Sequence, residues 1–493
     1  MSRRTLAGAL SLATALTVTA VPLAASASQR AVSFPSSKFP LGARAVPKTQ
    51  QHAVATGIDE YDLVAGTSTD GYTVTVLMPS GRDYGQQSTA ETKAAEVEAA
   101  GQTPSVQRVV RPKVADAPEQ VVYMVRVGLW TLKDKKKAAE TAKALNDAGV
   151  KSKVDYLGDD GVKTTGPWKV HVVTVDSRSF RGSYVASLGA SVAKRETVSE
   201  MAKAQNAVAA VNGGFFNIHT AKELRGEPVG ASVVNGKLLS EAVPGRSAVV
   251  LQGRKARITE LETRVTAISQ DGAKSPVNGI NRAAATDELV LYTEEYGAKT
   301  PADGGTDAVL DANGKILGLR AGGAAISAGQ RVLHGSGTAA EWLNEHAWQD
   351  WTVKVDTKVV DLRKKRALKL TPELNVIAGY GGLVRNGHVK VTAKRDGQDA
   401  VNMILRRHPR TLVGVTRNGS LILAAVDGRD PGKTVGANFL EAAQLMRWLG
   451  AVEAVILDGG GSTAMVVKGK LVNRPSDGKE RGVGDALLVL NPR

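Results

Sequence analysis

The chain contains no cysteine and few histidines or aromatic residues, and each shortage excludes a class of functional site. Without cysteine there can be no disulfide, no thiol nucleophile and no thiolate ligand for a metal ion. The 7 histidines include no pair in the spacing His-x-x-x-His, so a structural zinc site is not expected. Aromatic residues make up 4% of the chain, which leaves few side chains to stack on nucleic-acid bases. We therefore expect neither a zinc protein nor a nucleic-acid-binding protein.

Long apolar runs are also missing, except at the N-terminus. Arg3 and Arg4 precede an apolar stretch at residues 6–23, and the small residues Ala-Ser-Ala follow at 25–27. This is the pattern of a secretory signal peptide, which we assign to residues 1–27. No later stretch is long and apolar enough to cross a bilayer. We therefore expect a secreted protein, extracellular or associated with the cell wall, with no membrane span after signal cleavage.

Basic residues outnumber acidic ones by a wide margin. The formal net charge is +16 in a chain of 493 residues. In an exported protein, such a charge attracts an anionic partner over long range. The charge predicts an anionic wall polymer or a phosphorylated substrate as the partner.

Changes in composition divide the rest of the chain into three parts. Residues 28–58 are rich in Ser, Pro, Ala and Gln without periodicity, and we interpret them as a linker. Residues 59–162 alternate strand and helix patterns, which predicts a small α+β module. Residues 166–493 contain many short apolar runs and few helical stretches, which predicts a large domain built on a twisted sheet. The expected fold class is α+β.

The second half of the small module resembles a known family. Val127-Gly128-Leu129-Trp130 ends a predicted strand, and Gly149-Val150 follows a predicted helix. This arrangement is similar to the sporulation-related repeat family, SPOR, whose members bind the glycan strands of peptidoglycan. The resemblance implies that this module binds peptidoglycan. The alternative is a small α+β unit that packs on the large domain.

Two apolar strands of the large domain end in glycine turns. Asp458-Gly459-Gly460-Gly461-Ser462-Thr463 follows one apolar run, and Asn212-Gly213-Gly214 follows another. Glycines let a ligand approach the backbone, whose N–H groups can hold an anion, and the two hydroxyls add further donors. We expect both turns to bind the substrate.

Six motifs in the large domain resemble the phosphodiester glycosidase family, and the resemblance spans residues 166–493. They are Asn212-Gly213-Gly214-Phe215-Phe216, Gly379-Tyr380-Gly381-Gly382-Leu383, His408-Pro409-Arg410-Thr411, Asp427-Gly428-Arg429, Asp458 to Thr463, and Asn473-Arg474-Pro475-Ser476-Asp477 with Arg481. One departure is that the proline often found before the position of Leu383 is absent. The resemblance implies a hydrolase that cleaves the sugar C–O bond of a glycosyl 1-phosphodiester and releases free sugar and a phosphomonoester. The expected substrate is an anionic phosphoglycan of the cell wall or the extracellular space, or a smaller sugar phosphodiester.

That reaction needs a clamp on the phosphate, a carboxylate near the anomeric carbon and a positioned water. Arg410 and Arg481 are the candidate clamps, because a guanidinium binds phosphate through a bidentate fork. Asp458 is the leading catalytic carboxylate. Glu227 and Asp427 are the candidates for the partner acid or base.

Other polar residues near these motifs are candidates for weaker roles. Asn212 and Asn473 can donate hydrogen bonds to sugar hydroxyls or to an acetamido group. Asp485 follows a glycine and is expected to end a strand ladder. For Arg429 and Asp427, which share one turn, a mutual ion pair is the alternative to a role in the site.

Two other functions remain open from the sequence. The same carboxylates could hold a divalent cation, in a metal-dependent phosphodiesterase that cuts the P–O bond and releases sugar 1-phosphate. The second is a wall-glycan-binding protein without catalysis. The glycosidase interpretation itself requires no cofactor, and no metal ligands are assigned.

Overall fold

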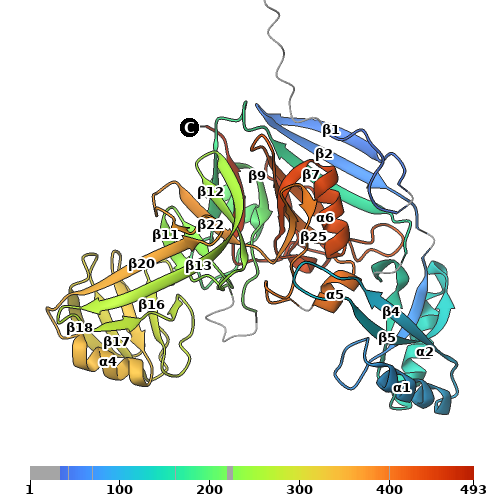
Figure 1. Ribbon diagram of the computed structural model, residues 1–493, viewed down its shortest axis with the longest axis horizontal. Coiled ribbons are helices and arrows are strands. Elements are labelled where there is room, and N and C mark those ends of the chain that lie inside the picture. The colour runs from blue at the N-terminus through green and yellow to red at the C-terminus, as the bar shows by residue number, and fades with distance from the viewer. Residues whose placement is uncertain are drawn as a thin grey trace, which may run out of the picture.

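The computed structural model describes most of the chain beyond its N-terminal segment (Figure 1). The described residues are 34–42, 44–68, 70–160, 163–218, 226–398 and 400–492. The predicted signal peptide at residues 1–27 lies outside these ranges. No helix within them is long and apolar enough to span a membrane. Strands dominate the described part and helices are few, which is consistent with the predicted α+β class.

An antiparallel sheet of eight strands, the main sheet, lies at the centre of the molecule. In spatial order its strands are β1 (Lys48–Ala55), β2 (Ile58–Ala65), β7 (Trp168–Val175), β26 (Leu421–Val426), β25 (Arg410–Thr416), β27 (Ala451–Ile456), β23 (Gly381–Arg385) and β24 (His388–Val389). Helix α6 (Phe439–Trp448) packs on one face. The sequence of β26 is apolar throughout, Leu-Ile-Leu-Ala-Ala-Val, because both faces of the sheet are covered.

Two further sheets cover the other face of the main sheet. The five-stranded one consists of β29 (Lys470–Leu471), β28 (Met465–Val467), β9 (Ala207–Asn212), β30 (Ala486–Leu490) and β8 (Ser183–Ser187), with α3 (Val198–Ala204) on its outer side. The eight-stranded one consists of β11 (Lys237–Ser240), β10 (Ser232–Val234), β22 (Leu374–Ala378), β12 (Ser247–Gln252), β13 (Lys255–Ser269), β20 (Val353–Asp361), β21 (Arg366–Ala367) and β14 (Lys274–Pro276). Val211 and Val249 from these sheets pack against Val413 and Val455 of the main sheet.

A small subdomain is inserted between the long strands β13 and β20. It contains β15 (Gly279–Ile280), β16 (Leu289–Thr293), β17 (Thr306–Leu310), β18 (Ile316–Ala321), β19 (Arg331–Gly335) and α4 (Thr338–His346). Figure 1 shows it at the far end of β13 and β20, away from the main sheet. Its core is separate from the one around the main sheet.

The N-terminal module is a four-stranded antiparallel sheet with two helices on one face. Along the chain its elements are β3 (Tyr72–Val76), α1 (Gln87–Ala99), β4 (Pro104–Arg111), β5 (Gln120–Trp130), α2 (Lys135–Asp147) and β6 (Ser152–Tyr156), and the spatial order is β4-β5-β3-β6. Val74 and Val127 face the helices, and the buried face of α2 consists of Ala138, Ala142 and Leu145. These observations confirm the strand and helix pattern predicted for this module.

The first two strands correct the predicted linker at residues 28–58 and the start of the module at residue 59. Strands β1 and β2 form a hairpin, and β2 pairs with β7 along its full length, from Ile58 beside Val175 to Ala65 beside Trp168. They therefore belong to the main sheet. The sequence of β1 shows no apolar alternation because it is an edge strand, and its side chains are exposed except near its end.

The helix-free face of the module packs against the large domain. Tyr84, Val122 and Met124 of the module form an apolar cluster with Val401 and Leu405 of the large domain, which lie on the short helix α5 (Ala400–Leu405). Side chains alternate between the two faces of a strand. The neighbours of Val74 and Val127 on β3 and β5 therefore point toward the large domain.

A buried ion-pair network joins the module to the large domain. Arg406, which follows α5 and is 5% exposed, pairs with Asp83 and, at 2.7 Å, with Asp155 of the module. Arg126 of the module pairs with Asp160, whose backbone bridges to Arg406. Leaving any one of these buried charges unpaired would cost folding free energy. The ion pairs therefore hold their partners in fixed positions. The module is thus docked rigidly on the large domain.

We predict that Arg406→Met lowers the free energy of unfolding by about 3–5 kcal/mol, because it leaves buried carboxylates without their cation. Differential scanning calorimetry should show a lower Tm for the module and its neighbours. The matched control is Lys143→Met, which breaks an exposed pair with Asp147 on α2 and should cost about 1 kcal/mol or less. Equal effects of the two substitutions would show that the network does not fasten the module.

Candidate functional site

Three chain segments meet at one end of the main sheet and bring two aspartates together. The backbone N–H of Asp458, after β27, donates to the carbonyl of Gly213, after β9, at 3.1 Å. The N–H of Gly213 in turn donates to the carbonyl of Asp485, just before β30, at 2.8 Å. A Cβ on Gly213 would collide with the carboxylate of Asp485, so only glycine fits there. Asp458 and Asp485 thus flank Gly213 on its two sides.

The two carboxylates are both held in a poorly solvated environment. Burial raises the pKa of Asp458 to about 6. The nearby hydroxyl of Ser462 and the N–H of Gly459, which donates to Oδ1 at 2.8 Å, oppose this shift. Burial raises the pKa of Asp485 to about 7, and the charge of Asp458 adds to this. Only the amide of Gly214 faces the carboxylate of Asp485, and neither of its oxygens accepts a hydrogen bond of good geometry among the described residues. A carboxylate pair with raised pKa values is typical of acid–base sites.

Each glycine of the loop after Asp458 lies against a different arginine. The ideal Cβ position at Gly459 is 3.6 Å from Cδ of Arg410, and that at Gly460 is 3.2 Å from both Nη atoms of Arg429. Gly460 also has a φ of 60°, which favours glycine. At Gly461, a Cβ would collide with the guanidinium of Arg481. The loop therefore lies against three arginine side chains, and its backbone is next to the guanidinium groups of Arg429 and Arg481.

Arg410 is the most deeply buried of these three arginines. It is 3% exposed, its Nε donates to the carbonyl of Ala437 at 2.8 Å, and its guanidinium lies 5.0 Å from the ring centre of Phe439. Burial lowers its pKa to about 10. Among the described residues no carboxylate forms an ion pair with Arg410. A buried cation in these surroundings is a strong partner for an anionic ligand.

The other two arginines are more exposed. Arg481 donates from Nε to Asp477 at 2.9 Å, so an ion pair already fixes its position. Arg429 donates from Nη2 to Nδ1 of His408 at 3.2 Å. Burial and the charges of Arg410 and Arg429 lower the pKa of His408 to about 2, so this histidine is a neutral acceptor. Arg429 does not pair with Asp427, the alternative considered from the sequence.

Aromatic side chains form one wall beside the charged groups. Phe215 stacks on Tyr380 with ring centres 5.3 Å apart, and Tyr380 meets Phe439 edge to face at 6.5 Å. Burial raises the pKa of Tyr380, and the charge of Asp458 contributes to the shift. Phe216 is buried in the core, whereas Phe215 is half-buried. Such a wall can pack against the apolar face of a sugar ring.

Asn212 and Asn473 hold the loops together with their side chains. The amide of Asn212 donates to the carbonyl of Asp458 at 2.9 Å and accepts from Thr411 at 2.6 Å. The side chain of Asn473 accepts from the N–H of Met465 at 2.7 Å and donates to a backbone carbonyl. Both side chains are buried, so in this structure their hydrogen bonds fix the backbone. Their predicted bonds to the sugar would need these contacts to be replaced.

The hydroxyls predicted to bind the substrate lie where the loop turns. Ser462 and Thr463 are buried, and neither side-chain oxygen has a hydrogen-bond partner of good geometry among the described residues. Buried polar atoms are normally satisfied. Ser462 lies beside Asp458, where its hydroxyl lowers the carboxyl pKa. These hydroxyls remain candidates for contacts with substrate.

Two of the predicted carboxylates are not brought together with Asp458. Glu227 is buried, which raises its pKa to about 8, and the charges acting on it are those of Glu241 and Arg282. Asp427 accepts from the N–H of Arg474 at 3.0 Å, and His171 lies 3.5 Å from its other oxygen. The structure offers Asp485 as the partner of Asp458 in their place.

From the sequence, Asp485 is expected only to end a strand ladder, and for Arg429 both an ion pair with Asp427 and a role in the site are open. Asp485 reaches the site because β30 pairs with β9, which places it beside Gly213. No local pattern shows this pairing between strands far apart in the chain. For Arg429 a signal was present, since it belongs to one of the six motifs of the family resemblance.

Residues 306–490 match the family model described as phosphodiester glycosidase. The match identifies a phosphodiester glycosidase domain over these residues and confirms that part of the predicted resemblance. It includes Asp458, Asp485 and the three arginines of the glycine loop. The resemblance of the N-terminal module to the SPOR family stays a prediction.

Curated relatives match shorter segments of the chain. The mouse protein named N-acetylglucosamine-1-phosphodiester alpha-N-acetylglucosaminidase is 33% identical over 119 residues, which are 22% of this chain and 22% of that protein. The SPbeta prophage-derived uncharacterized protein YomE of Bacillus subtilis (strain 168) is 38% identical over 86 residues, 17% of this chain and 13% of that protein. The chain thus spans less than a quarter of the length of either relative.

One solved structure is similar to the chain almost throughout. A crystal structure of a protein from Burkholderia pseudomallei K96243 superposes with a TM-score of 0.81 and 28% sequence identity. The superposition covers 93% of this chain and 99% of that chain. The arrangement of large domain, inserted subdomain and N-terminal module therefore occurs in an experimental structure.

We predict that Asp485→Asn stabilises the protein at pH 8, by on the order of 2 kcal/mol, because it removes a buried charge. The native pKa of about 7 lies above the ordinary value of 3.8, so on acidification the folded state takes up a proton before the unfolded chain does. The wild type therefore gains stability as the pH falls from 8 to 5, and the advantage of the variant shrinks. Denaturant unfolding at both pH values measures this.

The control for that experiment is Asp356→Asn, which changes a partly exposed carboxylate paired with Lys358 on β20. It should change stability little, with the same effect at both pH values. If Asp485→Asn destabilised the protein equally at pH 5 and pH 8, the carboxyl of Asp485 would not carry a raised pKa.

Proposed function

Because residues 306–490 match the phosphodiester glycosidase family model, we propose that this protein hydrolyses a glycosyl 1-phosphodiester at the sugar C–O bond. The observation that carries the proposal is the position of Arg410, Arg429 and Arg481 against the glycines that follow Asp458. The guanidinium groups beside this loop suit a phosphate, and the neighbouring carboxylates suit an anomeric carbon.

In the proposed reaction, water supplies the oxygen that bonds to the anomeric carbon. The bond from that carbon to the phosphate oxygen breaks, and the phosphomonoester leaves with the bonding electrons. The carboxylate pair of Asp458 and Asp485 takes the proton of the water, either directly or after a covalent step with the sugar. Asp458 is the better placed to stay ionised, because it accepts the N–H of Gly459 and has the lower pKa.

The arginines are expected to matter more than an acid catalyst in this reaction. A phosphomonoester has a second pKa of about 6, so it departs with little need for a proton. Its developing charge instead needs fixed cations close by. Arg410 is held by Ala437 and Phe439, and Arg481 by Asp477, so both are pre-positioned.

The finer proposal concerns the location and the substrate. We propose a secreted enzyme that acts on a phosphoglycan of the cell wall or of the extracellular matrix. The N-terminal pattern of residues 1–27 supports secretion, and the net charge of +16 supports an anionic polymer as substrate. The name of the mouse relative supports N-acetylglucosamine as the first sugar to test.

We predict that the mature protein cleaves an N-acetylglucosamine α-1-phosphodiester in heavy-oxygen water without placing label in the phosphate. Isotope shifts in the phosphorus spectrum are the measurement, because the anomeric oxygen of the free sugar exchanges with water and the phosphate oxygens do not. Label in phosphate, or activity lost in chelator, would instead mean a metal-dependent phosphodiesterase. Binding without turnover across a set of sugars would mean a glycan-binding protein.

We predict that Arg429→Gln lowers kcat/KM roughly 10- to 100-fold, the loss of about 1.5–3 kcal/mol for a hydrogen bond to a charged group. Steady-state kinetics with the same phosphodiester measures this. Arg417→Gln is the matched control, since Arg417 is an exposed arginine in the turn between β25 and β26. Equal kcat/KM values for the two variants would show that Arg429 does not bind the phosphate.

A further inference from the structure

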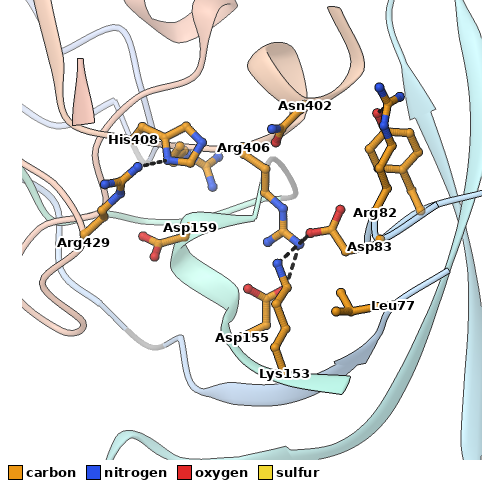
Figure 2. A pocket seen from close by; sticks show the side chains of 13 residues that line it. Leu77, Arg82, Asp83, Lys153, Asp155, Asp159, Asn402, Arg406, His408 and Arg429 are labelled. Carbon is orange, nitrogen blue, oxygen red and sulfur yellow. Dashed lines mark hydrogen bonds and ion pairs between the residues drawn. The ribbon is translucent and has the colours of Figure 1, made fainter. Parts of the chain in front are cut away.

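A polar cleft of about 430 Å³ lies between the N-terminal module and the large domain (Figure 2). One wall comes from the module, with Lys153 and Asp155 on β6 and Asp159 just after it. The other wall comes from the large domain, with Arg406 and His408. A cleft between two units of a protein is a common place for ligand binding, and this volume is within the usual range.

The walls of this cleft are fixed relative to each other. Besides the ion pairs of Arg406, the guanidinium of Arg407 donates to the carbonyl of Gly158 at 3.1 Å and pairs with Glu441 at 2.7 Å. Glu441 belongs to α6, so the network extends from the module into the large domain's core. Such a cleft is pre-formed and does not need to close on its ligand.

The cleft is continuous with the candidate active site through Arg429. The guanidinium of Arg429 lies against Gly460 on one side and lines the cleft on the other, where it binds His408. Figure 2 shows Arg429, His408 and Asp159 on the same side of the cleft. A substituent on a phosphate held by Arg429 would therefore extend toward Asp159.

Most charges in the cleft already have partners, but Asp159 does not. Lys153 pairs with Asp83 at 2.9 Å, and Arg406 with Asp83 and Asp155. Oδ1 of Asp159 is buried without a hydrogen bond among the described residues. Burial, followed by the charge of Asp155, raises the pKa of this carboxyl to about 7, and nearby arginines oppose the shift. A buried carboxyl oxygen left unpaired in this way is costly unless a ligand satisfies it.

We propose that this cleft binds the aglycone, the group on the far side of the phosphate from the cleaved sugar, and that Asp159 accepts hydrogen bonds from its hydroxyls. The aglycone class that fits is a polyhydroxylated one, a hexose or an alditol. Among the described residues that line the cleft, Leu77 is the single aliphatic one and most others are charged or polar, which disfavours a lipid. This inference rests on the proposed function, because it assigns the part of the substrate beyond the phosphate. It also gives the N-terminal module a direct part in substrate recognition.

The test compares two phosphodiesters of N-acetylglucosamine, one with a hexose 6-position as aglycone and one with methyl. Asp159→Asn should lower the preference for the hexose substrate, the ratio of the two kcat/KM values, by about tenfold or more, as expected for one hydrogen bond to a charged group. Leu77→Trp, which fills the cleft, should lower the same ratio without removing a charge. Asp147→Asn on the exposed surface of α2 is the matched control and should leave the ratio unchanged.

Two results would overturn the aglycone site. One is an unchanged ratio in both cleft variants, and the other is an equal loss with both substrates, which would place Asp159 at the phosphate. If neither phosphodiester is hydrolysed, the proposed function fails. Calorimetric titration with glucose 6-phosphate and with methyl phosphate then tests separately whether the cleft binds the aglycone. Tighter binding of glucose 6-phosphate that Asp159→Asn abolishes would support the cleft site, and equal binding of the two phosphates would overturn it.

Discussion

The buried side-chain amide of Asn212 connects the two sheets that supply the candidate active site. It binds the backbone of Asp458 and the hydroxyl of Thr411, both at the end of the main sheet, and the N–H of Ala464 next to the five-stranded sheet. Two of these bonds hold the two ends of the glycine loop and the third holds β25. Together with the backbone bond between Asp458 and Gly213, they fix the distance between the glycine loop and Gly213. Catalytic geometry of this kind tolerates errors of only about 0.5 Å.

The site contains a buried cation and a buried carboxyl group that have few ion pairs or hydrogen bonds within the protein. Arg410 is buried without a carboxylate in ion-pair contact among the described residues, and Asp485 is buried with almost no hydrogen bonding. Both arrangements cost folding free energy, which the extensive core around the main sheet offsets. A ligand with a phosphate and a partly positive anomeric carbon would compensate both charges at once.

Local patterns predicted the parts of the structure that depend on neighbours in the chain. Apolar strands followed by glycines indicated the turns at Asp458 and Asn212, and alternating strand and helix patterns indicated the N-terminal module. Asp485 could not be found in this way, because it joins the site only through the pairing of β30 with β9. The same reason applies to β1, whose exposed side chains show no apolar alternation. The hairpin of β1 and β2 joins the main sheet through β7, which is distant in the chain.

The pairing of β2 with β7 shows where the N-terminal module is inserted in the main sheet. Ala65, where the chain leaves the main sheet, is the register partner of Trp168, where it returns. Adjacent strands lie about 4.8 Å apart, so a turn of a few residues could bridge this gap. The whole module therefore occupies the position of a hairpin loop. An ancestral sheet with a short turn there would have been complete without it, and recognition of a second chemical group could have been added by growth of that loop alone.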